Sequence, residues 1–169
     1  MPRRYGRMAL LSSGHSPRAR DVTHGHVAGR GVRAFDFRCE AGHATRRVTR
    51  HYSVLVAEGV EAPRVLMWHV EDLALAPLAA REGRTVAAPW RCVGEPSAAE
   101  QLAHAAGALG ERPVSMEVRD GKLLLCAPTS GADREDAIGP DDLEMLLNRL
   151  DAERVSRHAS DVEITPPAR

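Results

Sequence analysis

The sequence predicts an α+β fold: a mainly antiparallel sheet of six to seven strands with helices packed on one face. Three observations predict it. Residues 32–58 alternate with the period of two that marks a half-buried β-hairpin. Residues 114–126 carry a second hairpin pattern, and segments beginning near 97 and 140 carry helix start signals. The resulting order β-β-β-β-α-β-α-β-β-α is typical of an antiparallel sheet with helices on one side.

The central hairpin is expected to hold much of the aromatic core. Apolar side chains fall on one face of each arm, because they occupy alternate positions. The residues on these faces are Phe35, Phe37, Cys39, Tyr52, Val54 and Val56. The 27 residues of the hairpin contain both phenylalanines and one of the two tyrosines of the chain.

The strand that precedes this hairpin is expected at residues 21–27, followed by a glycine turn. If Val27 pairs with Val32, then His24 lies opposite Phe35. The first three strands would then form a meander.

The second half of the chain supplies the remaining strands. The apolar run 64–70 predicts a central strand covered on both faces. Residues 84–93 are expected to form one edge strand, because Pro89 would interrupt the hydrogen bonds of a central one. A short helix is expected from about Ala76, where Pro77 suits a first turn. Asp120-Gly121 suits a type I′ turn between two strands.

Two longer helices are also expected. Ser97 and Glu100 match a capping box, so a helix should begin there and run to residue 109, where Gly110 ends it. Pro140 opens the last helix. Its apolar stripe consists of Leu143, Leu146, Leu147 and Leu150.

The 169 residues, 43% of them hydrophobic, suffice for one domain with a core. We expect a flexible basic arm at 1–18, a single α+β domain at 19–157 and a disordered tail at 158–169. No run of 18 apolar residues predicts a membrane-spanning helix. The three cysteines, Cys39, Cys92 and Cys126, are expected to be buried free thiols in a reducing, cytoplasmic setting.

The net charge of zero hides a charge asymmetry along the chain. Residues 1–50 hold 11 arginines against three acidic residues, whereas residues 51–169 hold 12 basic and 20 acidic residues. The basic part predicts contact with an anionic partner or an anionic lipid surface. Its candidate residues are Arg3, Arg4, Arg7, Arg18, Arg20, Arg46, Arg47 and Arg50.

Several stretches resemble a family of uncharacterised bacterial proteins. They are Arg18-Ala-Arg-Asp-Val22, the stretch from His24 to Phe37, and the stretch from Thr49 to Val56. The segment from Pro140 to Leu147 is similar to the family's last helix. In that family a short pair of membrane helices usually precedes a soluble α+β domain, and no activity is assigned. The resemblance implies an α+β fold and no catalytic residues, and this chain departs from the pattern by lacking the membrane helices.

A metal site is the hypothesis that gathers the most ligand-type residues. His24, His26, Cys39 and His43 carry side chains suited to Zn²⁺. The expected strand register opposes it, because Cys39 would lie opposite Arg20, four residues from His24. Four residues span roughly 13 Å along a strand. A slipped register or a curled arm would bring them together.

Parts of the sequence also fit two further classes of function. A hydrolase could gather Asp36, Cys39, His51 and Ser53, but none lies in a nucleophile motif. Nucleic-acid binding would use the basic arm with Arg46, Arg47 and Arg50. No exposed aromatic platform for stacking bases is evident there, which disfavours this class.

The sequence therefore predicts a non-catalytic accessory or protein-binding module, acting in the cytoplasm or at the inner face of a membrane. No catalytic residue, cofactor or specific small molecule is predicted. The alternatives are a metal-binding or hydrolytic enzyme and a nucleic-acid-binding protein.

Overall fold

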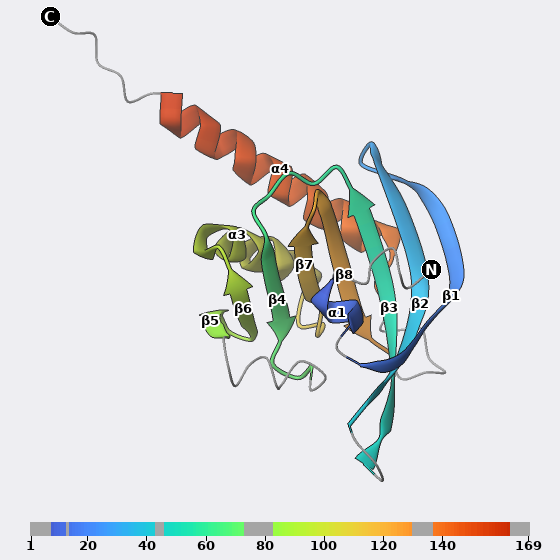
Figure 1. Ribbon diagram of the computed structural model, residues 1–169. Helices are drawn as coiled ribbons and strands as arrows, with labels where there is room; N and C mark the ends of the chain where they lie inside the picture. Colours follow the sequence, from blue (N-terminus) through green and yellow to red (C-terminus); the bar gives the residue numbers. More distant parts are fainter. Residues whose placement is uncertain (1–7, 13, 43–45, 73–82, 130–136, 163–169) are drawn as a thin grey trace, which may run out of the picture.

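One antiparallel sheet of eight strands organises the molecule, in the order β1-β2-β3-β8-β7-β4-β6-β5 (Figure 1). The computed structural model describes residues 8–12, 14–42, 46–72, 83–129 and 137–162, with side chains described up to residue 154. The strands are β1 (His15–Val27), β2 (Arg30–Ala41), β3 (Val48–Glu58), β4 (Val65–His69), β5 (Arg84–Ala87), β6 (Trp90–Gly94), β7 (Ser115–Arg119) and β8 (Lys122–Pro128). The helices are α1 (Ala9–Ser12), α3 (Pro96–Ala106), the 3₁₀ helix η4 (Gly107–Leu109) and α4 (Pro140–Val162).

The predicted α+β class is confirmed, but the count of six to seven strands is wrong, because residues 84–93 form a hairpin instead of one strand. Ala88 and Pro89 make its turn. Pro89 therefore separates two strands. Of these two, β5 is an edge strand of the sheet and β6 is an inner strand, since β6 pairs with both β4 and β5.

The predicted meander of β1, β2 and β3 is confirmed, but the register between β1 and β2 differs from the expected one by two residues next to the turn and by three at Arg18 to Arg20. Ala28 and Gly29, with φ of 47° and 74°, form a two-residue turn that pairs Val27 with Arg30. Two positive φ values in succession match the twist of adjacent strands, so the tighter turn is preferred. His24 consequently lies opposite Arg33.

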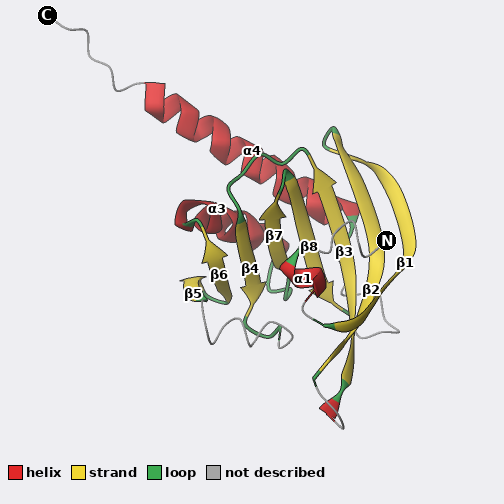
Figure 2. Ribbon diagram, in the orientation of Figure 1, coloured by secondary structure: helices red, strands yellow, loops and turns green. Residues whose placement is uncertain are grey.

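Apolar side chains cover both faces of the sheet. Helices α3 and α4 pack on one face, while the short α1 packs on the other (Figure 2). The expectation that all helices lie on one face is therefore wrong for residues 9–12. We call the core under α3 and α4 the first core and the core on the opposite face the second core. Leu10 and Leu11 of α1 join Phe35 and Phe37 in the second core, and the alternation of the hairpin predicts the position of both phenylalanines there.

Helix α3 begins with a different capping residue from the predicted one, whereas the helical segment ends before Gly110 as predicted. Glu95, rather than Ser97, caps α3, because its carboxylate accepts hydrogen bonds from the Ala98 amide at 2.7 Å and the Ser97 hydroxyl at 2.6 Å. A carboxylate at this position also favours the positive end of the helix dipole. The predicted stop is confirmed, since Gly110 follows η4 with φ of 71°.

Two described elements extend beyond the predicted limits of the domain. Strand β1 begins at His15, so residues 15–18 belong to the sheet and not to an arm. Helix α4 continues to Val162, so residues 158–162 are helical, and the helix projects beyond the sheet (Figure 1). The expected helix near Ala76 lies outside the described residues.

Candidate anion-binding pocket

Two arginines and a histidine lie directly opposite one another on β1, β2 and β3. Arg18 pairs with Arg38, and Arg38 pairs with His51. Directly opposite residues of antiparallel strands point to the same face, with Cβ atoms about 4.5–5.5 Å apart. All three side chains are exposed. They form one row, which we call the basic row.

The basic row continues the face that α3 and α4 cover elsewhere. Leu55 lies on this face under the helical layer, and Ser53, two residues earlier in β3, donates a hydrogen bond from its hydroxyl to the Ile138 carbonyl at 3.3 Å. His51 lies two residues before Ser53 on β3, and its side chain is exposed.

A cavity of about 220 Å³ occupies this corner. It is lined by Arg18, Arg20, Asp21, Asp36, Phe37, Arg38, His51, Tyr52, Thr129 and Ala137. The Thr129 amide donates a hydrogen bond to the His51 carbonyl at 2.9 Å, which fixes this wall of the cavity to β3. We call the cavity the basic pocket.

The basic pocket holds acidic as well as basic side chains, and Arg20 lies directly opposite Asp36. No ion pair joins Arg18, Arg20 or Arg38 to a described carboxylate. Asp21 and Asp36 also line the pocket, so three arginines face two carboxylates. Like charges placed directly opposite destabilise a sheet, and Arg38 has a cationic neighbour in the basic row.

The arginines predicted to contact an anionic partner do not lie together in the described part of the structure. Arg18 and Arg20 line the basic pocket. Arg46 and Arg47 lie at the end of the β2–β3 hairpin, where Arg47 pairs with Glu40 at 3.6 Å. Arg50 lies opposite Cys39 in the sheet, with a buried Nε atom. Arg3, Arg4 and Arg7 lie outside the described residues.

Sequence reasoning missed Arg38 and considered His51 only as a residue of a hydrolase. The alternation of β2 already indicates that Arg38 points away from the core face of Phe37, but a single exposed arginine carries no signal. Its pairing with Arg18 depends on the β1–β2 register, which the sequence did not predict correctly.

Among the described residues, the candidate metal ligands do not meet. His24 lies opposite Arg33, six residues before Cys39 on β2, which is roughly 20 Å along the strand. Cys39 is buried in the second core, and His43 lies outside the described residues. Among the residues described, no group of three or more His, Cys, Asp and Glu side chains is arranged to hold a metal ion.

The residues of the hydrolase hypothesis are also divided. Asp36 lies opposite Ser53, but the Ser53 side chain is buried and its hydroxyl is bonded to a backbone carbonyl. Cys39 points to the opposite face of the sheet. Burial, with the charge of Asp72 in addition, raises the pKa of the Cys39 thiol, so the reactive thiolate is disfavoured.

A buried polar cluster lies on the face opposite the basic pocket. The Tyr52 hydroxyl and the Ser115 hydroxyl each donate to the Asp72 carboxylate, both at 3.2 Å. The Ser115 oxygen in turn accepts from the His69 amide at 3.2 Å. Burial raises the pKa of Tyr52, with Asp72 adding to the effect. These contacts satisfy one another, as structural polar groups in a core do.

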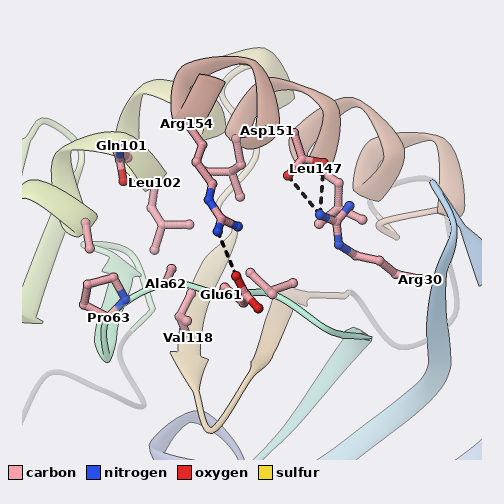
Figure 3. Close-up of a pocket in the computed structure, with 13 residues that line it drawn as sticks. Arg30, Glu61, Ala62, Pro63, Gln101, Leu102, Val118, Leu147, Asp151 and Arg154 are labelled. Atoms are coloured by element: carbon pink, nitrogen blue, oxygen red, sulfur yellow. Dashed lines mark hydrogen bonds and ion pairs between the residues drawn. The ribbon is translucent and has the colours of Figure 1, made fainter. Parts of the chain in front are cut away.

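A second cavity, of about 150 Å³, lies between α3, α4 and the β3–β4 connection (Figure 3). Its floor is apolar, with Leu102, Val118 and Leu147 among its residues. Two ion pairs close its rim, as Figure 3 shows: the Arg30 guanidinium binds both oxygens of Asp151 at 2.9 and 3.0 Å, and Arg154 binds Glu61 at 2.7 Å. These ion pairs join α4 to β2 and to the β3–β4 connection.

No match to this chain was found among models of known protein families, curated proteins or solved structures. The resemblance to the family of uncharacterised bacterial proteins therefore stays a prediction. Within the described part of the chain, none of the helices combines the length and the apolar character needed to cross a membrane.

Proposed function

We propose that this protein is a non-catalytic binding module that docks an anionic partner protein at the basic pocket. The observation that carries the proposal is the basic row: Arg18, Arg38 and His51 stand in register on an exposed face. Such an arrangement costs stability in the free protein, and an anion across the row would offset that cost. The proposal keeps the expectation of a cytoplasmic accessory module.

The chemistry of the pocket supports binding over catalysis. A nucleophile would need a free hydroxyl or thiolate beside a base. Near His51, the Ser53 hydroxyl is buried and bonded to Ile138, and Cys39 lies on the other face. Arginines, which stay protonated, supply fixed positive charge instead of a proton acceptor.

The distribution of charge favours a compact anionic group over a nucleic acid. Asp21 and Asp36 lie among the arginines, so the basic side chains of the pocket do not form the continuous positive surface that a phosphate backbone would follow. The aromatic rings nearest to the pocket, those of Phe37 and Tyr52, are buried in the second core and offer no stacking surface.

A capture experiment tests the proposal. The tagged protein is purified from its own cells with Arg38 intact and with Arg38→Glu, and bound proteins are identified by mass spectrometry. We expect a stoichiometric partner that is lost with Arg38→Glu and released by salt. Arg149→Glu is the matched control, because Arg149 is an exposed arginine of α4 that does not line the pocket. Equal capture by all three proteins would refute the proposal.

A further inference from the structure

We infer that the cavity between α3, α4 and the β3–β4 connection binds a small carboxylic acid whose apolar part is about the size of a benzene ring. We call this cavity the helix pocket. It shares none of its lining residues with the basic pocket, so the inference goes beyond the proposed function and does not depend on it. Its apolar interior and the two arginines at its rim carry the inference (Figure 3).

The interior of the helix pocket favours an apolar group over water. Ala98, Leu102, Val118 and Leu147 are among its lining residues, and each of them is buried. A water molecule in a cavity needs about two to four polar partners, which these side chains do not supply. An apolar cavity of about 150 Å³ holds benzene, and the helix pocket has this volume. A ring of six carbon atoms, or a branched chain of similar size, therefore fits the interior.

The charged side chains at the rim favour an anionic head group on this ligand. In both ion pairs of the rim the arginine is the less exposed partner. The Arg30 side chain is 20% exposed and that of Asp151 is 49% exposed. The Arg154 side chain is 54% exposed and that of Glu61 is 76% exposed. The carboxylates thus lie more in solvent than the guanidinium groups, and a ligand in the pocket has the positive partners closer at hand.

The pair of Arg154 with Glu61 is the one that a ligand can exchange. Both side chains are more than half exposed, and an exposed ion pair contributes little to stability because water competes for both partners. Figure 3 shows Arg154 reaching from α4 toward Glu61 on the β3–β4 connection. A carboxylate attached to the buried ring would meet the same planar fork of N–H donors, which matches carboxylate oxygens. The ligand would therefore replace Glu61 at Arg154.

The other ion pair of the rim is expected to stay intact. Arg30 is mostly buried, and its guanidinium binds both oxygens of Asp151 at 2.9 and 3.0 Å. The four charges of the rim sum to zero, so no net charge attracts the ligand from a distance. Most of the affinity must come from burial of the ring, and the carboxylate adds selectivity through one exchanged ion pair.

Benzoate is the probe, and its binding to the full chain is measured by titration followed by NMR. Three comparison probes each change one feature. Acetate keeps the carboxylate without the ring, benzyl alcohol keeps the ring without the charge, and benzylamine reverses the charge. We expect benzoate to bind with a Kd of about 1 mM. Each comparison probe should bind about tenfold more weakly or not at all.

Two substitutions at the exchangeable pair assign the binding to this pocket. Arg154→Gln should weaken the binding of benzoate by about tenfold and leave that of benzyl alcohol unchanged. Glu61→Gln should strengthen the binding of benzoate by about twofold to fivefold, because the competing carboxylate is gone. Both side chains are exposed, so both variants should fold. Arg149→Gln is the control, since Arg149 is an exposed residue of α4 that lines neither pocket, and it should change neither affinity.

Several results would overturn the inference. The site is wrong if benzoate does not bind at about 10 mM, or if acetate binds as tightly as benzoate. The anionic head group is wrong if benzyl alcohol or benzylamine binds as tightly as benzoate. A purely structural role of the ion pair would lower the stability of Arg154→Gln and Glu61→Gln and leave the affinity for benzoate unchanged in both.

Discussion

Glu117 places a carboxylate inside the second core, where the side chain is 1% exposed. Its Oε2 atom accepts the Leu10 amide at 3.2 Å, so it holds the short helix α1 against the sheet. Burial raises the pKa of Glu117 above its ordinary value of 4.5, although backbone hydrogen bonds from Leu10 and Ala9 oppose the shift. A single residue thus links the attachment of α1 to pH.

The raised pKa of Glu117 predicts how stability depends on pH. Just above pH 4.5 the unfolded chain has released this proton and the folded protein still holds it. The folded state therefore binds more protons there, and its free energy of unfolding should fall as pH rises through that window. Glu117→Gln, which keeps an oxygen to accept from Leu10, should remove this fall. Urea unfolding at a series of pH values checks it, and parallel pH profiles for both proteins would contradict it.

The sequence predicts on which face of a strand each side chain lies, because this property depends only on local alternation. The faces of Phe35, Phe37 and Cys39 follow from a period of two, which needs no knowledge of the partner strand. The basic row needs the pairing of Arg18 with Arg38, and this pairing depends on two features of β1 and β2. The turn at Ala28-Gly29 shifts the expected register by two residues, which leaves every side chain on its face. The irregularity between Arg20 and Thr23 shifts it by one more, so that Arg18 lies opposite Arg38 instead of Cys39.

At the scale of elements, strand and helix boundaries were predicted where one strong signal acts alone. The turn at Asp120-Gly121 joins β7 and β8 as expected, with φ of 51° and 71°. Residues 84–93 are predicted as one strand but form two, since Pro89 is compatible both with an edge strand and with a turn. Ser97 is predicted to cap α3 but does not, because Glu95, two residues earlier, competes for the same backbone amides.

The basic row should weaken the pairing of β1, β2 and β3. Removing one of its charges with Arg38→Gln should raise the free energy of unfolding by about 0.2–1 kcal/mol at low salt. The gain should shrink at high salt, because screening already relieves the repulsion. Chemical denaturation at two salt concentrations checks this, with Arg149→Gln as a control without change. A loss of stability in Arg38→Gln would show that Arg38 is a structural residue.

Gly94 ends β6 where the sheet admits no side chain. Its φ is 124°, and a Cβ atom would lie 2.5 Å from the Arg64 carbonyl oxygen on the connection before β4. Gly59 is a matched control, since its φ is 73° and a Cβ atom there would meet nothing within 4 Å. We expect Gly59→Ala to cost about 1–2 kcal/mol of stability from backbone strain alone. Gly94→Ala should cost clearly more in urea unfolding, and equal losses would contradict the clash.

For the whole molecule, the sheet divides the interior into two cores that are held by elements of very different size. The first core is closed by α3 and α4, and ion pairs from Arg30 and Arg154 fasten α4. The second core is covered in part by α1, a helix of four residues. A helix this short has little stability of its own, so its attachment depends on packing and on Glu117.

The three free cysteines report separately on these two cores. Cys92 lies in the first core, whereas Cys39 and Cys126 lie in the second. Gly14 approaches Cys39 so closely that a Cβ atom there would lie 2.8 Å from the sulfur, which shows that the segment after α1 covers this thiol. Opening of the N-terminal segment should therefore expose Cys39 before Cys92.

Leu10→Ala and Leu102→Ala test this division of the interior. Each removes a buried leucine at a cost of about 2–5 kcal/mol, one from α1 and one from α3. Under native conditions all three thiols should react slowly with a thiol reagent, because they are buried. Leu10→Ala should accelerate the reaction of Cys39 and Cys126 while Cys92 stays protected, and Leu102→Ala should favour Cys92. Mass spectrometry after timed labelling assigns each thiol. If both variants expose all three thiols at one rate, the two cores open together, and α1 is an integral part of one cooperative fold instead of a separately held cover.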